Sequence, residues 1–223
     1  MIGGQGSAGR DATDGANLTA HALQNGRVST SGLLHRYAQE WRTATSHPFL
    51  DGIRDGSLRA GAFAAWLQQD YLFVGDLLPF QARLLAAAPR AAQEVLARGV
   101  VALESELTWF EAQVARRGLV LDGPRQPTTQ AYREELERLL SEPFEVGMTA
   151  LWAVEQAYLE AWRGAAPGSA EYREFVEHWT EPSFATYVTG LEVHTSDSPL
   201  AEAAWLRIVR LEHEFWDMAL GAG

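Results

Sequence analysis

The fold is indicated most clearly by residues 59–88, which read RAGAFAAWLQQDYLFVGDLLPFQARLLAAA. Large apolar side chains recur three and four positions apart in this stretch, which is the pattern of an amphipathic helix. The same texture of Ala, Leu, Glu, Arg and Gln begins at Leu33 and continues towards the C-terminus. No segment alternates apolar and polar residues as a strand does. The sequence therefore predicts an all-α protein.

Turn residues divide the chain into helices joined by short loops. The expected helices are 32–45, 59–88, 90–118, 128–141, 144–164, 169–179, 182–194 and 198–220, separated by Pro- and Gly-containing turns. Short loops and the lack of a linker favour one helical-bundle domain over 31–223. Residues 1–30 are rich in Gly, Ala, Ser, Thr and Asn without an apolar period, so we expect a flexible tail.

Composition excludes several classes of function. The chain has 223 residues with 18 Lys+Arg against 29 Asp+Glu, a formal net charge of −11 that disfavours binding to nucleic acid or to an anionic membrane. It has no cysteine, which excludes disulfides, Cys-ligated metals and a thiol nucleophile. Neither a signal sequence nor a long apolar run is present. We expect a cytoplasmic protein.

Three acidic residues lie within apolar helix stripes. If angles around the helix axis are measured from Trp66, Asp70 lies at roughly 40°, between Phe63 and Phe73. Glu155 shares an arc of roughly 120° with tryptophan and tyrosine rings, and Glu212 lies in a similar arc of the last helix. Burying an unpaired carboxylate costs several kcal/mol unless it becomes neutral. One explanation is an Arg partner or a backbone cap for each acid, and the other is a shared polar pocket.

We favour the shared pocket because three acids flanked by aromatic residues match the composition of ligand sites. Such a pocket suits acid–base chemistry on a flat, nitrogen-bearing ring, with one carboxyl donating a proton and another accepting one. Ordinary core packing remains the simpler interpretation for most of the 8 tryptophans. The aromatic residues expected to contact the ring are Phe73, Trp152, Tyr158, Trp179 and Trp216.

Four motifs resemble the TenA proteins, relatives of thiaminase II with a haem-oxygenase-like all-helical fold. HPFLDGIRDGSLRAGAFAAWLQQDYLFV at 47–74 looks like the opening signature of that family, and LEHEFWDMAL at 211–220 resembles its C-terminal signature. ALWAVEQAYLEAW at 150–162 and FVEHWTEPSFATYV at 175–188 are similar to segments of its cysteine-less branch. The resemblance spans Leu33 to Leu220 and implies a helical bundle of the TenA type.

The resemblance also implies roles for individual residues. Asp70 matches the aspartate that holds the ring nitrogen and amino group of a pyrimidine, and Thr149 occupies the place of the catalytic cysteine. Glu155 matches the glutamate that the cysteine-less branch uses instead, and Glu212 matches the second catalytic glutamate of the family. Because a threonine hydroxyl is a far poorer nucleophile than a thiolate, the chemistry is expected to move to these two glutamates.

The implied reaction belongs to thiamine salvage and needs no cofactor. It is hydrolysis of 4-amino-5-aminomethyl-2-methylpyrimidine, or of its N-formyl form, to the hydroxymethylpyrimidine. Asp70 would orient the ring, Glu212 would protonate the departing amine and Glu155 would deprotonate the attacking water, or the two glutamates would exchange roles. Relatives form dimers and tetramers, so a homo-oligomer is expected.

Two other functions remain open from sequence alone. The first is a haem-oxygenase-like metal or haem oxidase. In the haem case, His35 or His47 would be the axial ligand. The inward Glu-x-x-His pairs of a di-iron bundle are lacking, however, and Glu174 with His178 is an isolated pair. The other is a protein that binds an aminopyrimidine without turning it over. The two glutamates argue for catalysis, because ring recognition requires only Asp70.

Overall fold

The structure is a computed structural model that describes residues 30–121 and 123–222, and the described part is helical without a strand. Apart from Thr30, the expected tail lies outside the described residues. The helices are α2 (Ser31–Arg36), α3 (Ala38–Thr45), α4 (Pro48–Asp55), α5 (Ala60–Ala87), α6 (Arg90–Arg117), α7 (Pro127–Leu139), α8 (Phe144–Gly164), α9 (Arg173–Trp179), α10 (Pro182–Glu192) and α11 (Pro199–Gly221).

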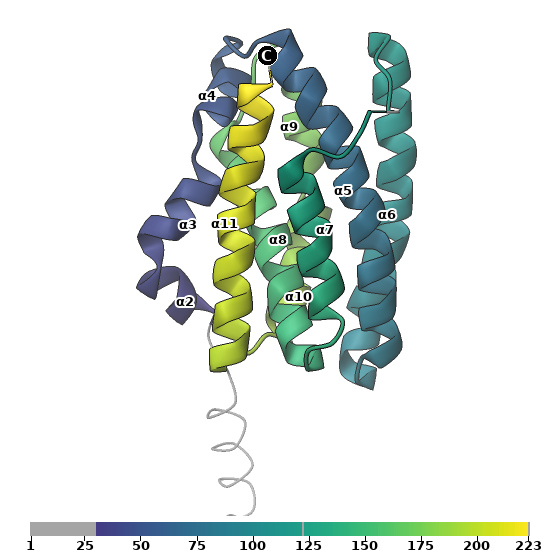
Figure 1. Cartoon of the computed structure of the whole chain (residues 1–223), viewed down its shortest axis with the longest axis vertical. Helices are drawn as coiled ribbons and strands as arrows, with labels where there is room; N and C mark the ends of the chain where they lie inside the picture. The colour runs from purple at the N-terminus through teal and green to yellow at the C-terminus, as the bar shows by residue number, and fades with distance from the viewer. Residues whose placement is uncertain (1–29, 122, 223) are drawn as a thin grey trace, which may run out of the picture.

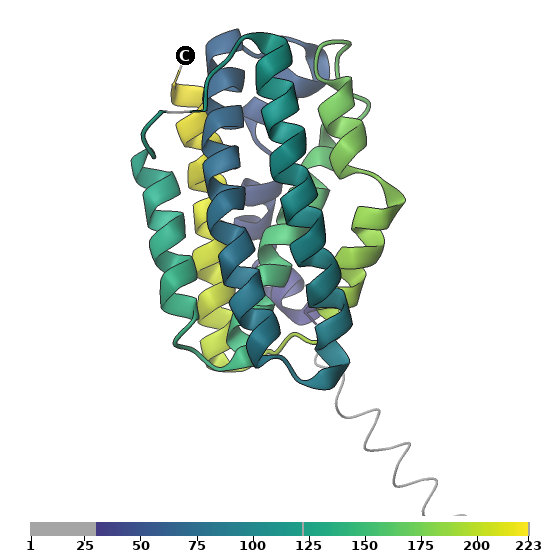
Figure 2. The same ribbon diagram turned by 90° about the vertical axis from the view of Figure 1, so that its right-hand side faces the viewer.

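The long helices run side by side along the length of the molecule around α8 (Figure 1). Helix α8 is buried over most of its length and contacts α11, α10, α3 and α9 among others. Helices α5 and α6 pair along one side, whereas α2, α3 and α4 flank α11 on the other (Figures 1 and 2). No helix of the described residues is long and apolar enough to cross a membrane. The expectation of an all-helical bundle is confirmed.

One predicted helix is interrupted, another begins later than expected, and one helix was not predicted. The helix expected over 32–45 is interrupted at Tyr37, whose φ of −115° and ψ of 38° are not helical. The helix expected over 169–179 begins only at Arg173. Helix α4 was missed, although its ends are well specified: the His47 ring accepts a hydrogen bond from Phe49 N–H, and Gly56 ends it at a φ of 81°.

Candidate active site

Carboxyl groups from three helices meet at a cavity in the middle of the bundle. The cavity has a volume of about 20 Å³, room for about one water molecule. Among the described residues, its walls contain three acids, Asp70 of α5, Glu106 of α6 and Glu155 of α8, and no Arg, Lys or His. Its full lining is Asp70, Phe73, Val74, Leu77, Leu103, Glu106, Val154, Glu155, Tyr158, Trp179 and Phe184.

A larger groove of about 900 Å³ adjoins the cavity on the side of α6, α9 and α10. Glu106, Trp179 and Phe184 line both spaces, so these three side chains form the boundary between them. Helix α10 contributes Phe184 to this boundary, and of its residues only Val188 and Leu191 are fully buried. The groove is therefore the natural route between solvent and the acidic cavity.

Asp70, Glu106 and Glu212 each accept a hydrogen bond from an aromatic side chain. The Tyr158 hydroxyl donates to Asp70 Oδ2 at 2.5 Å, and the Trp179 indole Nε1 donates to Glu106 Oε1 at 2.8 Å. These bonds fix the position of each carboxyl group and leave its second oxygen free for a ligand.

Glu212 is the third acid held in this way, on the opposite side of the site from Glu106. It does not line the cavity, and its Oε1 accepts a hydrogen bond from the Tyr132 hydroxyl at 2.5 Å. The charge of Glu212 nevertheless raises the pKa of both Asp70 and Glu155, which places it within electrostatic reach of the cavity. The structure thus brings together the three acids that the helix geometry selected.

Burial gives these carboxyl groups unusual acidities. It raises the pKa of Asp70 well above its ordinary value and that of Glu155 to about 8, and the charges of Glu106 and Glu212 add to both effects. Burial also raises the pKa of Glu212 and of Glu106 to about 7, against the hydrogen bonds that each accepts. Groups that ionise near neutral pH can both give and take protons under physiological conditions.

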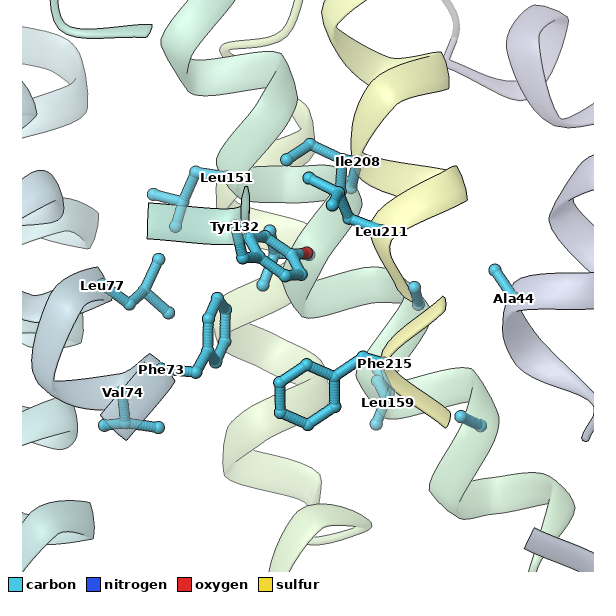
Figure 3. Packing of buried hydrophobic residues seen from close by; sticks show 14 of the residues in the cluster. Ala44, Phe73, Val74, Leu77, Tyr132, Leu151, Leu159, Ile208, Leu211 and Phe215 are labelled. Carbon is cyan, nitrogen blue, oxygen red and sulfur yellow. The ribbon is translucent and has the colours of Figure 1, made fainter. Parts of the chain in front are cut away.

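The expected aromatic residues do not all reach the cavity. Phe73, Tyr158 and Trp179 line it, and Phe73 faces Tyr132, with ring centroids 4.5 Å apart (Figure 3). Trp216 lies behind Tyr158, with centroids 6.1 Å apart, and its Nε1 donates to the Ala44 carbonyl.

Trp152 is placed away from the cavity, in the core against α3. Its ring stacks on Trp41, with centroids 6.4 Å apart. The physical reason is its angular position on α8, roughly 60° from Glu155, which turns the indole towards α3. Its contacts are those of a core residue.

Thr149 is buried, and its hydroxyl is fully used in structural hydrogen bonds. Thr149 Oγ1 donates to the Glu145 carbonyl at 2.8 Å and accepts from Ser196 N–H at 2.8 Å. The side chain thereby ties α8 to the loop before α11, and Thr149 does not line the cavity.

Comparison with known proteins identifies the family. Residues 34–222 match the model of the TENA/THI-4/PQQC family. The chain belongs to this family. A probable bifunctional TENA-E protein of Glycine max is 32% identical, over 91% of this chain and 97% of the relative.

A second relative by sequence and one solved structure also match nearly the whole domain. An aminopyrimidine aminohydrolase of Halalkalibacterium halodurans is 27% identical, over 86% of this chain and 96% of the relative. The crystal structure of a TenA homologue from Pyrococcus furiosus superposes with a TM-score of 0.80 at 28% identity, covering 85% of this chain and 98% of that one. The expected TenA-type bundle is confirmed.

Sequence reasoning missed Glu106 and Tyr132 of the site, and also Tyr187, which lines the groove and whose hydroxyl donates to Gln81 Oε1. Glu106 follows Leu103 by three positions and precedes Phe110 by four, so the helical period places it on the apolar stripe of α6. Tyr132 and Tyr187 lie on the buried sides of α7 and α10, where a tyrosine is indistinguishable from a core ring until its hydroxyl partner is known.

The described residues contain one group of three side chains with metal-ligand atoms in proximity, His47, His213 and Asp217, at the junction of α4 and α11. The His47 Nδ1 accepts a hydrogen bond from Phe49 N–H, so neutral His47 carries its proton on Nε2. That Nε2 lies 3.1 Å from Asp217 Oδ1 and donates to it. A metal would have to displace this proton, so the cluster fits a hydrogen-bonded clamp better than a metal site.

Proposed function

We propose that this TenA protein hydrolyses an aminopyrimidine, 4-amino-5-aminomethyl-2-methylpyrimidine or its N-formyl derivative, to the hydroxymethylpyrimidine. The observation that carries the proposal is the gathering of carboxyl groups, each without an Arg partner, beside an aromatic cavity. The 27% identity to an aminopyrimidine aminohydrolase supports the same reaction class.

Asp70 is the residue proposed to hold the ring. Burial raises the pKa of Asp70 well above its ordinary value, which favours the protonated form of its carboxyl group. It then offers one O–H donor and one oxygen acceptor, which complement a ring nitrogen beside an amino group. The hydrogen bond from Tyr158 keeps the carboxyl in place, and Phe73 and Trp179 supply apolar surface for the ring.

Glu155 and Glu212 are proposed as the acid–base pair. The pKa values of both groups lie near neutral pH, about 8 for Glu155 and about 7 for Glu212, so each carboxyl group can hold or release a proton under physiological conditions. We place Glu155, which lines the cavity, as the proton donor and Glu212 as the base, the exchanged form of the assignment first expected.

The reaction balances with one water consumed and one amine released. Glu155 gives a proton to the amine nitrogen, and the C–N bond breaks with its electron pair going to nitrogen. A water oxygen bonds to the exocyclic carbon and passes a proton to Glu212. Return of that proton to Glu155 through solvent restores the starting state. No cofactor is required.

Product analysis after incubation with thiamine, the aminomethylpyrimidine and its N-formyl form tests this proposal. We expect hydrolysis of an aminopyrimidine and no cleavage of thiamine. Glu155→Gln and Glu212→Gln should each lower kcat about 10²- to 10⁴-fold, and Glu214→Gln on the outer side of α11 should be unchanged. Cleavage of thiamine alone, or near wild-type turnover by both variants, would contradict the proposal. Binding of the ring without turnover would identify a binding protein.

A further inference from the structure

Glu106 occupies the boundary between the acidic cavity and the outer groove, and the acid–base mechanism assigns it no task. Trp179 Nε1 donates to its Oε1, whereas its Oε2 has no hydrogen-bond partner among the described residues. A carboxyl group held in place with one free oxygen on a cavity wall is arranged to accept a hydrogen bond from a ligand.

The surroundings of Glu106 favour a positively charged ligand group. In the part of the chain that the structure describes, the cavity wall contains three acids and no basic residue. The charge of Glu106 acts on Asp70 and Glu155, raising the pKa of each, so the three carboxyl groups share one small space. A cation placed among them stabilises the ionised form of these carboxyl groups, whereas a neutral group does not.

The position of Glu106 also favours one orientation of the bound substrate. Glu106 lies on α6 and Glu212 on α11, at opposite sides of the bundle (Figure 1), with Asp70 and Glu155 within electrostatic reach of both. An amine that points towards Glu106 lies beside Glu155 and faces the groove, through which released ammonia can leave. Glu212 is then left on the side of the attacking water.

We propose that Glu106 is a specificity-determining residue that accepts a hydrogen bond from the exocyclic primary amine of the substrate as it becomes an ammonium, thereby selecting free amines over N-acylated ones. This inference rests on the proposed aminopyrimidine substrate. An amide nitrogen is not protonated at neutral pH and gains little from a carboxylate, whereas hydrogen bonds between charged groups are the stronger class.

The test compares two substrates in two variants. Glu106→Gln keeps the acceptor for Trp179 and removes the charge, and Glu104→Gln, an exposed position on the same helix, is the matched control. For Glu106→Gln we expect kcat/KM on the aminomethylpyrimidine to fall about 10- to 100-fold. Its activity on the N-formyl form should change less than about threefold. Glu104→Gln should match the wild type on both. Equal losses on the two substrates, or none on the amine, would overturn the role of Glu106 and leave the hydrolase intact.

Calorimetric binding separates this inference from the proposed reaction. The ligands are the aminomethylpyrimidine and the hydroxymethylpyrimidine, which differ at the exocyclic group. Wild-type protein should bind the amine more tightly, and Glu106→Gln should lose that preference while retaining affinity for the alcohol. This pattern without turnover would disprove the hydrolase and uphold the inference. Failure of the wild type to prefer the amine would overturn the inference regardless of turnover.

Discussion

Replacing Glu212 by Gln should make the protein more stable at alkaline pH, because it removes a buried group that is forced to ionise. The pKa of Glu212 is raised by burial from 4.5 to about 7. Between these values the unfolded chain releases the proton and the folded chain retains it, so the contribution of Glu212 to wild-type stability falls as the pH rises from 4.5 to about 7 and is constant above. An acid in a salt bridge has the opposite effect, because its stabilising contribution grows as the pH rises.

The magnitude follows from the same interval. At 1.36 kcal/mol per pH unit, the rise from 4.5 to about 7 corresponds to about 3 kcal/mol of stability lost by the wild type. Gln has nearly the same shape as the protonated carboxyl and still accepts from the Tyr132 hydroxyl. The two proteins should therefore be close in stability near pH 5 and differ by up to about 3 kcal/mol near pH 8.5. Loss of the Glu212 charge also lowers the pKa of Asp70 and Glu155, which acts in the same direction.

Urea unfolding followed by tryptophan fluorescence, from about pH 5 to about pH 8.5, measures this difference. The control is Glu214→Gln, which removes a half-exposed acid that pairs with Arg210 at 3.5 Å and should change stability by less than about 0.5 kcal/mol at every pH. A difference between wild type and Glu212→Gln that does not vary with pH would refute the reasoning, because Glu212 would then ionise alike in the folded and unfolded chains.

Two further substitutions probe residues outside the cavity. Trp152→Phe should lower the free energy of unfolding by about 1–3 kcal/mol and leave the KM for the aminopyrimidine unchanged. Urea unfolding measures the stability and steady-state kinetics measure KM. A raised KM at unchanged stability would place the Trp152 ring in the binding site. Glu135→Gln should destabilise the protein by about 1–3 kcal/mol near pH 7, because the carboxylate accepts from Arg138 and Arg207 at 2.8 Å. Burial alone would raise the pKa of Glu135, but these arginines outweigh it and lower the pKa, so the difference should shrink as the pH falls below about 4.5, where an unchanged difference would contradict this account.

The helical period was sufficient to predict most of the bundle and three of its buried acids. Asp70, Glu155 and Glu212 could be predicted because an acid inside a long apolar stripe is conspicuous at 100° per residue. The break at Tyr37 could not, because both sides of it continue the apolar pattern and the interruption depends on packing. Pairing of Glu135 with Arg207, 72 residues away, is likewise a tertiary contact that no local pattern reveals.

The tryptophans mark the limit of sequence reasoning about the site. Trp152 and Trp179 are both buried and both belong to apolar helix faces, yet one packs on α3 and the other donates to Glu106 at the cavity wall. Which neighbour each face meets depends on the order and rotation of the helices in the bundle. Period alone places a residue inside the protein, and only the packed structure tells core from cavity.

Phe184 places α10 in the wall between the groove and the cavity, so opening of that wall would control substrate access. A cavity with room for about one water molecule can accept a pyrimidine only after side chains of this wall, Phe184 among them, move aside. If the open arrangement is only a fraction of the population, the apparent affinity for substrate is reduced by that same fraction. Substitutions on the outer surface of α10, remote from every acid, would then tune the response of the enzyme to scarce substrate through an opening equilibrium, without altering its chemistry.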